Sequence, residues 1–510
     1  MRSTLCSIVS FLLITEANAL LSIPFTKVDP STKGSRRSLQ KKSISVAYLN
    51  QFPVYVVDIT LGTPPQSIQV QLDTGSSDLV VETSSSDLCT SDPTVCSGRG
   101  AYNANASTTY QYRSSDLVIL YGGGDGATGD YATDHFSIGS ASLTGFEFGI
   151  MYKSTVLEGI LGVGFEENEF TTGLDTPRTY PNLPVSLVTA GYIPSRAFSL
   201  YLNDDQDPTG GTLLFGGVDT EKYCGPLAQV PMVPDPRDPG LGIIAYFVAL
   251  SGINAAKNGV THSFASGSNS IEVLLDSGTT LTQLPSDLAA EIFTYLGATY
   301  DPASDSLPEI PCSTATQDIT INFNFGPITI KAPISQFVVF PDSGTCNLGI
   351  LPTDDTIILG DTFLSSAYTV YDLDNKVIYL AQAKFSSNSE NILEIEAGVD
   401  GVPHPSVNCG GSTTTTTTTT TTTHTTTKPT ITTTKTTTKK TTTTTKKPTT
   451  TKKVTTTAKK TTTKCTTKKT TTKPTTTKKT TMKTTTKCTK KTTTKPKPKT
   501  TTRKYYHWQH

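Results

Sequence analysis

The chain has 510 residues, of which 35% are hydrophobic and 17% are charged, and its formal net charge is zero. The balance hides an uneven distribution, because residues 412–510 contain 25 Lys or Arg and no Asp or Glu, whereas residues 1–411 carry a net charge of −25. An acidic body argues against nucleic acid as a partner, since phosphate is bound by Lys and Arg. With only six His in the chain, we also expect no metal and no cofactor.

The first residues have the layout of an export signal. Arg2 supplies a positive charge, Leu5–Ile14 is mostly apolar, and residues 17–19 (Ala-Asn-Ala) fit a cleavage site. We therefore assign residues 1–19 to a signal peptide. The apolar run is too short to span a bilayer. Secretion implies an oxidising compartment in which disulfides form.

Paired basic residues follow the signal, at Arg36-Arg37 and Lys41-Lys42. Such pairs are candidate processing sites, and a solvated basic stretch is the plain alternative. We interpret residues 20–42 as a pro-segment that lies outside the fold. Cleavage after Lys42 would leave residues 43–411 with 11 basic and 41 acidic residues. Self-repulsion in this body falls as carboxylates become protonated, which favours a protein that works in acid.

Short runs rich in Val, Ile, Tyr, Phe and Thr dominate the body, and turn residues bound them, as strands require. The predicted strands are Pro53–Leu61, Ser67–Leu72, Leu117–Leu120, Phe198–Leu202, Ile319–Phe325, Thr356–Leu359 and Thr369–Leu373. Helical patterns are few, and the best are Leu183–Ala190 and Ser286–Leu296, the latter with Ser286 as its N-cap and Asp287 in its first turn. The pattern predicts a large sandwich or barrel-like architecture.

One motif occurs twice. Residues 70–81 read VQLDTGSSDLVV and residues 272–284 read EVLLDSGTTLTQL, so Asp73 and Asp276 both follow an apolar strand. Each motif is followed, 89 and 84 residues after its Asp, by two apolar residues and a Gly, which are Ile160-Leu161-Gly162 and Ile358-Leu359-Gly360. Two halves with the same internal order predict a duplicated lobe.

The residues around each Asp suit acid–base chemistry. Hydroxyls can bind and orient a carboxylate, and glycines permit close backbone approach. The supporting residues are Thr74, Gly75, Ser76, Ser277, Gly278 and Thr279. If a pseudo-twofold axis brings the turns together, Asp73 and Asp276 share one proton, because two like charges cannot both ionise at short range. One carboxylate can then act as general base on water while the other protonates a carbonyl oxygen. A plain surface turn is the alternative for either motif alone.

These stretches resemble the pepsin-like aspartic endopeptidases, and among them the fungal secreted candidapepsins and yapsins. The resemblance covers about residues 43–400 and includes DITLGTPPQ (58–66), LDTGSSDLVV (72–81), EGILGVGF (158–165), LFGGVDTEKYCGPL (214–227) and LLDSGTTLTQLP (274–285). It implies a mainly β, bilobal fold whose pseudo-twofold related lobes, 43–202 and 203–400, flank a central cleft. It also implies that water held between Asp73 and Asp276 hydrolyses peptide bonds of protein or peptide substrates at acidic pH. We expect a monomer.

The family has a β-hairpin flap with a Tyr near its tip. The matching stretch, LVILYGGGDGATGDY (117–131), places Tyr121 as the flap Tyr and Gly122 and Gly123 at the substrate-binding tip, with a plain hairpin turn as the alternative. Pepsins commonly carry a Trp seven residues after the first catalytic Asp, hydrogen-bonded to the flap Tyr. Val80 occupies that position here, and the single Trp is Trp508. The flap Tyr therefore lacks that partner, and the sequence does not predict the resting position of the flap.

Nine Cys have to be placed. Cys89 and Cys96 are close within a polar loop and can staple it, and Cys312 and Cys346 match the second-lobe disulfide of the family. The sequence does not reveal the pairing of Cys224, Cys409, Cys465 and Cys488. A sequon begins at Asn105, so we expect a surface glycan there.

We interpret residues 401–411 as a linker and residues 412–510 as a disordered tail, because Thr runs interrupted by Lys bury too little apolar area to offset the entropy of ordering. The tail is a candidate mucin-like stalk, and a flexible tail without sugar is the alternative. It ends without a hydrophobic segment, so we expect no membrane anchor. Its charge makes it a candidate for binding anionic cell-wall material or the acidic body of its own molecule. We predict a secreted protein of the extracellular space or cell wall.

Two functional classes remain open. The intact Asp pair and both sets of hydroxyls favour an active acid endopeptidase, and the alternative is a catalytically silent, wall-attached binding protein on the same fold. A serine hydrolase is excluded, because the sequence contains no Gly-x-Ser-x-Gly. The activation route and the choice between basic pairs and apolar residues as cleavage sites cannot be read from the sequence.

Overall fold

The computed structural model describes residues 20–28, 54–122, 124–204, 210–264, 270–304, 306–339 and 346–408. The chain divides into two compact units, of which the first, Met1–Thr413 with Arg503–His510, holds all of these residues. The second unit, Thr414–Thr502, lies wholly outside them. The predicted signal peptide, both basic pairs and the predicted tail likewise lie outside the described residues and stay predictions.

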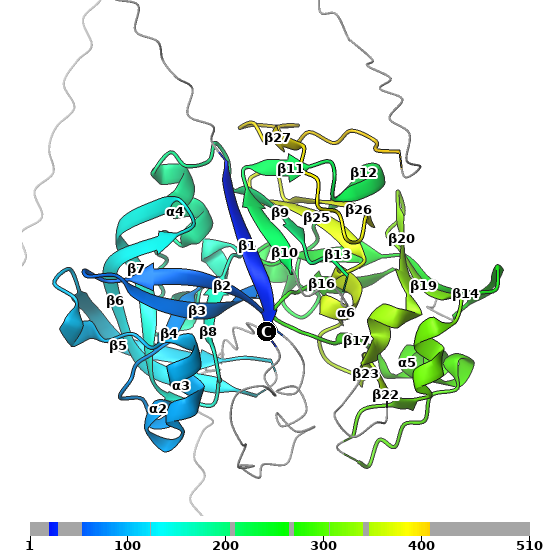
Figure 1. Ribbon diagram of the computed structural model, residues 1–510, viewed down its shortest axis with the longest axis horizontal. Helices are drawn as coiled ribbons and strands as arrows, with labels where there is room; N and C mark the ends of the chain where they lie inside the picture. Colours follow the sequence, from blue (N-terminus) through cyan, green and yellow to red (C-terminus); the bar gives the residue numbers. More distant parts are fainter. Residues whose placement is uncertain are drawn as a thin grey trace, which may run out of the picture. The chain divides into compact units, whose positions relative to one another are not determined.

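A 13-stranded sheet runs through the first unit in the order β12-β26-β25-β9-β10-β1-β2-β3-β8-β4-β7-β6-β5. Its N-terminal half consists of β1 (Leu21–Val28), β2 (Val54–Leu61), β3 (Gln66–Asp73), β4 (Leu79–Glu82), β5 (Gln111–Leu120), β6 (Gly126–Ile138), β7 (Ala141–Ser154) and β8 (Gly159–Gly162). The remaining strands are β9 (Ala197–Tyr201), β10 (Gly211–Phe215), β12 (Tyr223–Pro231), β25 (Ala367–Asp372) and β26 (Val377–Ala383). Figure 1 shows the N-terminal half in blue and cyan and the C-terminal half in green and yellow, with β1, β10 and β9 between them. The mainly β, two-lobed fold is thus confirmed.

In its described residues, the C-terminal half adds four smaller sheets. One has five strands, which are β13 (Phe247–Leu250), β16 (Ile271–Leu275), β24 (Ile358–Leu359), β17 (Thr282–Pro285) and β23 (Ile350–Thr353). Another has four, which are β15 (Val260–Ser263), β14 (Gly252–Lys257), β19 (Ile319–Asn324) and β20 (Thr329–Pro333). The two smallest comprise β18 (Glu309–Ile310), β22 (Cys346–Leu348) and β21 (Val338–Val339), and β11 (Gly217–Asp219) with β27 (Ile392–Glu394). Every strand predicted from the sequence has a counterpart among the observed strands.

The same strand arrangement occurs in both halves. In the N-terminal half β8 lies parallel to β3 and antiparallel to β4. In the C-terminal half β24 lies parallel to β16 and antiparallel to β17. The repeated sequence motif therefore corresponds to a repeated supersecondary unit. In each half, the strand with the two apolar residues before Gly162 or Gly360 lies between the two strands that flank the Asp motif.

Within the described residues the α-helices are short, and they are α2 (Asp87–Ser91), α3 (Pro93–Arg99), α4 (Leu183–Thr189), α5 (Ser286–Leu296) and α6 (Asp361–Leu364). The predicted helices correspond to α4 and α5, but the predicted N-cap is wrong. Pro285 occupies the N-cap position of α5, because β17 runs directly into the helix. The hydroxyl of Ser286, the first helical residue, donates instead to Asp354 Oδ1 at 2.7 Å.

Strand β1 lies within the segment that the sequence assigned to a pro-segment outside the fold. It pairs with β10 on one side and with β2 on the other. Leu21, Ile23 and Phe25 alternate into the core, each at most 3% exposed. Residues 21–28 are therefore part of the central sheet, and the prediction that they lie outside the fold is wrong. The sequence alone did not predict this strand, because Pro24 lies within the run and Pro argues against a strand assignment.

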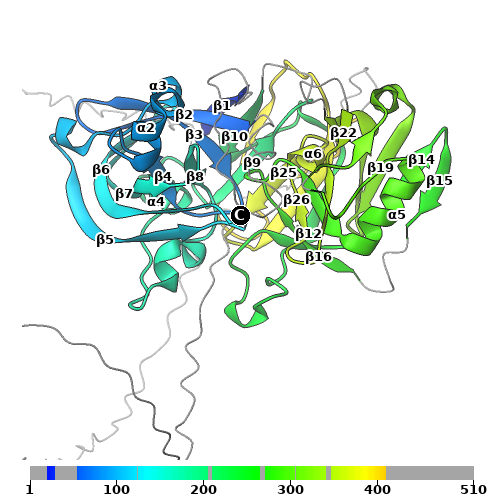
Figure 2. The ribbon, with the colours of Figure 1, turned by 90° about the horizontal axis from the view of Figure 1, so that it is seen from below.

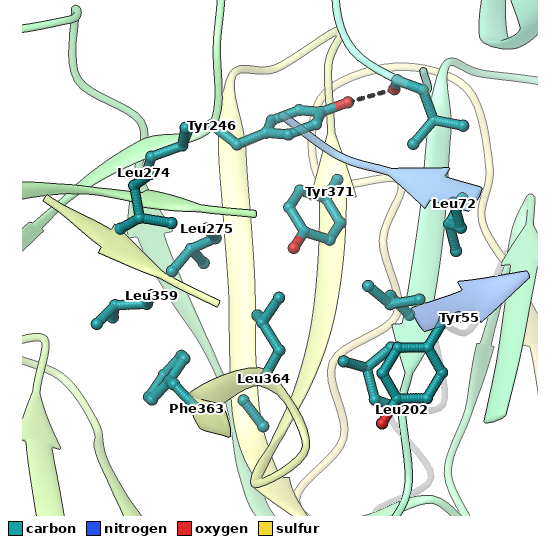
Figure 3. Close-up of a cluster of buried hydrophobic side chains, with 14 of the residues drawn as sticks. Tyr55, Leu72, Leu202, Tyr246, Leu274, Leu275, Leu359, Phe363, Leu364 and Tyr371 are labelled. Carbon is teal, nitrogen blue, oxygen red and sulfur yellow. Dashed lines mark hydrogen bonds between the residues drawn. The ribbon is translucent and has the colours of Figure 1, made fainter. Parts of the chain in front are cut away.

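The core between the halves is aromatic and aliphatic. Phe198 stacks on Tyr371 with 4.8 Å between ring centroids, and the Tyr246 hydroxyl donates to Val163 O at 2.7 Å. Figure 3 shows Tyr371 at the centre of this cluster, with Leu72 on one side and Leu275 on the other. Leu72 and Leu275 immediately precede the two motif aspartates, so packing of this core fixes the strand ends that carry them.

Candidate active site

The two repeated motifs place their aspartates at equivalent points of the fold. Asp73 is the last residue of β3, and Asp276 follows the last residue of β16. Each is hydrogen-bonded at the end of the strand that lies parallel to its own, since Val163 N, directly after β8, donates to Asp73 O at 3.0 Å, and Asp276 N donates to Leu359 O of β24 at 3.2 Å. The side chains are 1% and 0% exposed, respectively. Both carboxyl groups are therefore buried at the ends of apolar strands.

The residues after the aspartates bind the two halves to each other. Thr74 N donates to Ser277 Oγ at 3.2 Å, and Ser277 N donates to Thr74 Oγ1 at 2.9 Å. The Thr74 hydroxyl donates in turn to Leu275 O at 3.0 Å, and the Ser277 hydroxyl to Leu72 O at 3.1 Å. These four bonds are related by the approximate symmetry of the motifs, so each turn is positioned by the other half.

The turns also hydrogen-bond their own carboxylates. Gly75 N donates to Asp73 Oδ1 at 2.7 Å, and Gly278 N donates to Asp276 Oδ1 at 2.8 Å. The Thr279 hydroxyl donates to Asp276 Oδ2 at 2.6 Å. These donors orient one oxygen of each acid in the same way in the two halves.

Glycine is required in both motifs because the opposite carboxyl group occupies the space of a side chain. A Cβ atom on Gly75 would lie 2.6 Å from Asp276 Oδ1, and a Cβ on Gly278 would lie even closer to Asp73 Oδ1. The same Cβ on Gly278 would also lie 3.1 Å from Asp276 Oδ1, so the two carboxyl groups are neighbours around this glycine. The fold thus brings together two carboxyl groups from motifs 203 residues apart.

Burial raises the pKa of Asp73 well above its ordinary value, and the negative charge of Asp276 raises it further. The hydrogen bond that Gly75 N donates to Asp73 Oδ1 acts in the opposite direction. Two adjacent buried acids cannot both be charged at low energy, so burial and the neighbouring charge favour the protonated form of Asp73.

The β5–β6 hairpin brings a tyrosine to the same region. Tyr121 directly follows β5, and the tip is closed by Tyr121 N donating to Asp125 O at 2.8 Å and by Gly124 N donating to Tyr121 O at 2.9 Å. Tyr121 is 5% exposed, and its ring meets that of Phe170 edge to face at 5.6 Å. Burial raises the pKa of Tyr121, and the nearby charges of Asp73 and Asp78 add to the effect. Figure 2 shows β5 on the side of the N-terminal half opposite to β2 and β3. Gly122 lies in the turn and Gly123 lies outside the described residues.

Two buried acids near the site were not singled out from the sequence. Asp78 is 1% exposed and lies at the end of the first motif. Asp361 is 7% exposed and directly follows Gly360, the last residue of Ile358-Leu359-Gly360. Burial raises the pKa of Asp361 well above its ordinary value; Lys27 opposes the shift, while Asp276 and Asp73 add to it. Their positions next to the repeated motifs are the signal that was available in the sequence.

The structure joins Cys89 to Cys96, which links α2 to α3, and Cys312 to Cys346, with Cα–Cα distances of 5.5 and 5.0 Å. Cys224 is also disulfide-bonded, and its partner lies outside the described residues. Asn105 is exposed in a short 3-10 turn, Ala104–Ala106, and is therefore accessible to modification.

Within the described part of the chain, no group of His, Cys, Asp and Glu is arranged to hold a metal ion. Among the helices of the same residues, none is both long and apolar enough to cross a bilayer.

A duplicated β fold with two adjacent, buried carboxyl groups, one from each half, defines a hydrolase of the aspartic type. Residues 54–383 match the family model described as eukaryotic aspartyl protease. The chain is 41% identical over 388 residues to the probable aspartic-type endopeptidase opsB of Aspergillus oryzae, covering 74% of this chain and 78% of the relative. It is 38% identical over 363 residues to an acid protease of Saccharomycopsis fibuligera (70% and 88% covered) and 35% identical over 403 residues to aspartic proteinase yapsin-3 of Saccharomyces cerevisiae (76% and 78% covered). The chain belongs to the eukaryotic aspartyl protease family and is an aspartic endopeptidase.

Proposed function

We propose that the protein is a secreted endopeptidase that cleaves peptide bonds in acid by means of a water molecule activated between Asp73 and Asp276. The observation that carries the proposal is the close approach of the two carboxyl groups, each pressed against the motif glycine of the other half. Acids at this separation share a proton, which supplies one proton acceptor and one proton donor at a single site.

The chemistry needs no covalent intermediate. The ionised carboxylate removes a proton from water, whose oxygen attacks the carbonyl carbon of the substrate. The protonated carboxyl group transfers its proton to the carbonyl oxygen, so a neutral tetrahedral diol forms. Collapse of the diol breaks the C–N bond. The departing nitrogen takes the proton of the protonated carboxyl group, and a hydroxyl of the diol gives its proton to the other carboxylate, so the pair again holds one proton.

An acidic optimum follows from the same geometry. Catalysis requires one proton on the pair, and activity is lost as rising pH removes it. Burial and the adjacent charge of Asp276 raise the pKa of Asp73, which moves this loss to higher pH than an exposed Asp would show.

The flap completes the proposed site. Burial raises the pKa of Tyr121 and the charges of Asp73 and Asp78 add to the effect, which supports a role for Tyr121 near Asp73. We assign Tyr121 with Gly122 and Gly123 to the substrate-binding tip, because a Gly-rich tip permits close approach of a peptide backbone. An extended substrate pairs with such strands through backbone hydrogen bonds.

Export and processing belong to the same proposal. The relatives are named as endopeptidases and proteases without a compartment, so the support is the layout of residues 1–19, the disulfides and the exposed sequon at Asn105. Sequencing the N-terminus of the protein recovered from culture medium tests both the signal cleavage and the cut after Lys42. Protein retained inside cells with Met1 intact would contradict export.

Digestion of a peptide library at several pH values tests the activity, with Asp276→Asn as the diagnostic variant and the exposed Asp287→Asn as the matched control. We expect Asp276→Asn to lower the rate by about 10² or more, the scale of a lost general acid–base contribution. Asp287→Asn should cleave at the wild-type rate. Equal turnover by wild type and Asp276→Asn would reject the proposed site.

A further inference from the structure

Asp78 is a buried acid that the proposed chemistry does not use. It lies five residues after Asp73, between β3 and β4, and is 1% exposed. Its own carbonyl oxygen accepts a hydrogen bond from Gly162 N at 2.9 Å, so its backbone is tied to β8. A carboxylate in such a position is costly unless hydrogen-bond donors surround it.

Three donors converge on this carboxylate. The hydroxyls of Tyr180 and Tyr131 donate to Asp78 Oδ1 at 2.6 and 3.2 Å. Phe170 N donates to Asp78 Oδ2 at 3.0 Å. All three partners are donors, so the arrangement suits two acceptor oxygens, as only a carboxylate provides.

The donors come from the flap and from the segment on which the flap rests. Tyr131 lies in β6, the second strand of the flap hairpin. Phe170 begins the 3-10 turn Phe170–Gly173, and its ring supports Tyr121 edge to face at 5.6 Å. Asp78 therefore connects the loop that carries Asp73 both to β6 of the flap hairpin and to Phe170, which packs against the flap tyrosine.

A second layer of contacts holds the donors themselves. The Arg178 guanidinium lies over the rings of Tyr131 and Tyr180, at 4.8 and 5.7 Å from their centroids, and binds Glu147 Oε1 at 2.6 Å. Tyr180 N donates to Glu169 Oε2 at 2.9 Å. The tyrosine hydroxyls are thus presented to Asp78 by residues that are fixed independently of it.

We propose that Asp78 is a positioning residue for the flap, which holds β6 and the Phe170 support in register with the catalytic loop and so sets Tyr121 over the Asp73–Asp276 pair. The inference rests on the proposed function, in which the flap covers a peptide bound at that pair. It also accounts for Val80, which is fully buried in the same apolar cluster as Tyr121 and offers no polar atom to the flap. The polar contact with the flap comes instead from the carboxylate of Asp78, two residues before Val80.

Two variants test the role by different chemistry. Asp78→Asn keeps the shape but replaces one acceptor oxygen by an amide that must face either Phe170 N or the two hydroxyls. Tyr180→Phe removes a single hydroxyl donor from the same carboxylate. The matched control is Tyr223→Phe, because the Tyr223 hydroxyl is also buried and donates to Pro405 O at 2.9 Å, in the sheet region of β12 and away from the flap.

Two readouts separate positioning from general stability. We expect both flap variants to raise KM for a peptide substrate by about tenfold with kcat changed less than about threefold, because the Asp pair is untouched while contacts common to ground and transition states are lost. We also expect amide hydrogen exchange under native conditions to rise by about tenfold within residues 111–138 and to stay at the wild-type rate in the C-terminal half. Tyr223→Phe should leave both readouts at wild-type values.

The proposal is overturned if both flap variants match wild type in KM and in exchange across residues 111–138. It is equally overturned if Tyr223→Phe shifts both as much as they do, since the effect would then report stability alone. Asp276→Asn separates this inference from the proposed function, because it should lower turnover by about 10² or more without changing flap exchange. Full turnover in Asp276→Asn together with faster flap exchange in Asp78→Asn would reject the mechanism and retain the positioning role.

Discussion

Thr74 and Ser277 exchange backbone-to-hydroxyl hydrogen bonds across the boundary between the two halves of the molecule, at 3.2 and 2.9 Å. Each hydroxyl also donates to the carbonyl that precedes the opposite aspartate, so neither of the two turns that carry Asp73 and Asp276 is complete without the other half. The separation of the two carboxyl groups is therefore a property of the interface between the halves.

Removal of one member of this exchange should lower the stability of the fold. Thr74→Val leaves the buried Ser277 N–H without its acceptor, and we expect the free energy of unfolding to fall by about 1–3 kcal/mol. Urea unfolding measures this, with Thr294→Val as the control, because the Thr294 hydroxyl bonds Ala290 O on an exposed helix face. Thr294→Val should stay within about 0.5 kcal/mol of wild type. Equal losses in the two variants would show that the exchange has no special role.

Separating the carboxyl groups should stop catalysis while the protein stays folded. A methyl group at Gly278 would collide with Asp73 Oδ1, so Gly278→Ala pushes the two acids apart. We expect kcat to fall by about 10² or more, since the shared proton and the acid–base pair are lost together. Gly240→Ala is the control, because its Cβ would approach only Asp238 Oδ1, at 3.4 Å. Normal kcat in a folded Gly278→Ala would contradict the proposed geometry.

Glu169 should make the protein less stable as pH rises. Burial raises the pKa of Glu169 to about 10, from an ordinary value of 4.5, and the charge of Asp78 contributes. The folded state therefore keeps a proton that the unfolded chain releases, so this contribution to stability is complete below pH 4.5 and declines as pH rises toward about 10. Glu169→Gln stays neutral and should resist urea better than wild type at pH 8, with no such advantage at pH 4. The exposed Glu167→Gln is the control. An identical difference from wild type at both pH values would contradict the assignment.

Strand β1 should be needed for folding. Phe25 is 1% exposed, and its ring meets that of Tyr55 edge to face at 5.3 Å. We expect Phe25→Ala to lower the free energy of unfolding of the uncleaved chain by about 3–5 kcal/mol, the usual cost of removing a buried aromatic ring. Thr26→Ala, whose parent side chain is exposed on the same strand, is the control. Wild-type stability in Phe25→Ala would show that the strand is dispensable.

The sequence by itself determined the local units and their duplication. Apolar runs ending in Asp-Thr-Gly and Asp-Ser-Gly identify the strands and turns, because alternation, turn residues and small hydroxyl residues act within a few positions of each other. The repeat of the whole order predicts two equivalent halves, and the close spacing of Cys89 and Cys96 predicts their pairing.

Only the tertiary structure decided which distant groups meet. The alternation in Leu21–Val28 is interrupted by Pro24, and no local rule shows that β2 and β10 leave room for this strand. The sequence also does not show that Asp78 accepts hydrogen bonds from residues 53, 92 and 102 positions away. Such contacts depend on how strands from both halves pack around one core, and packing energy has no signature in any short stretch of chain.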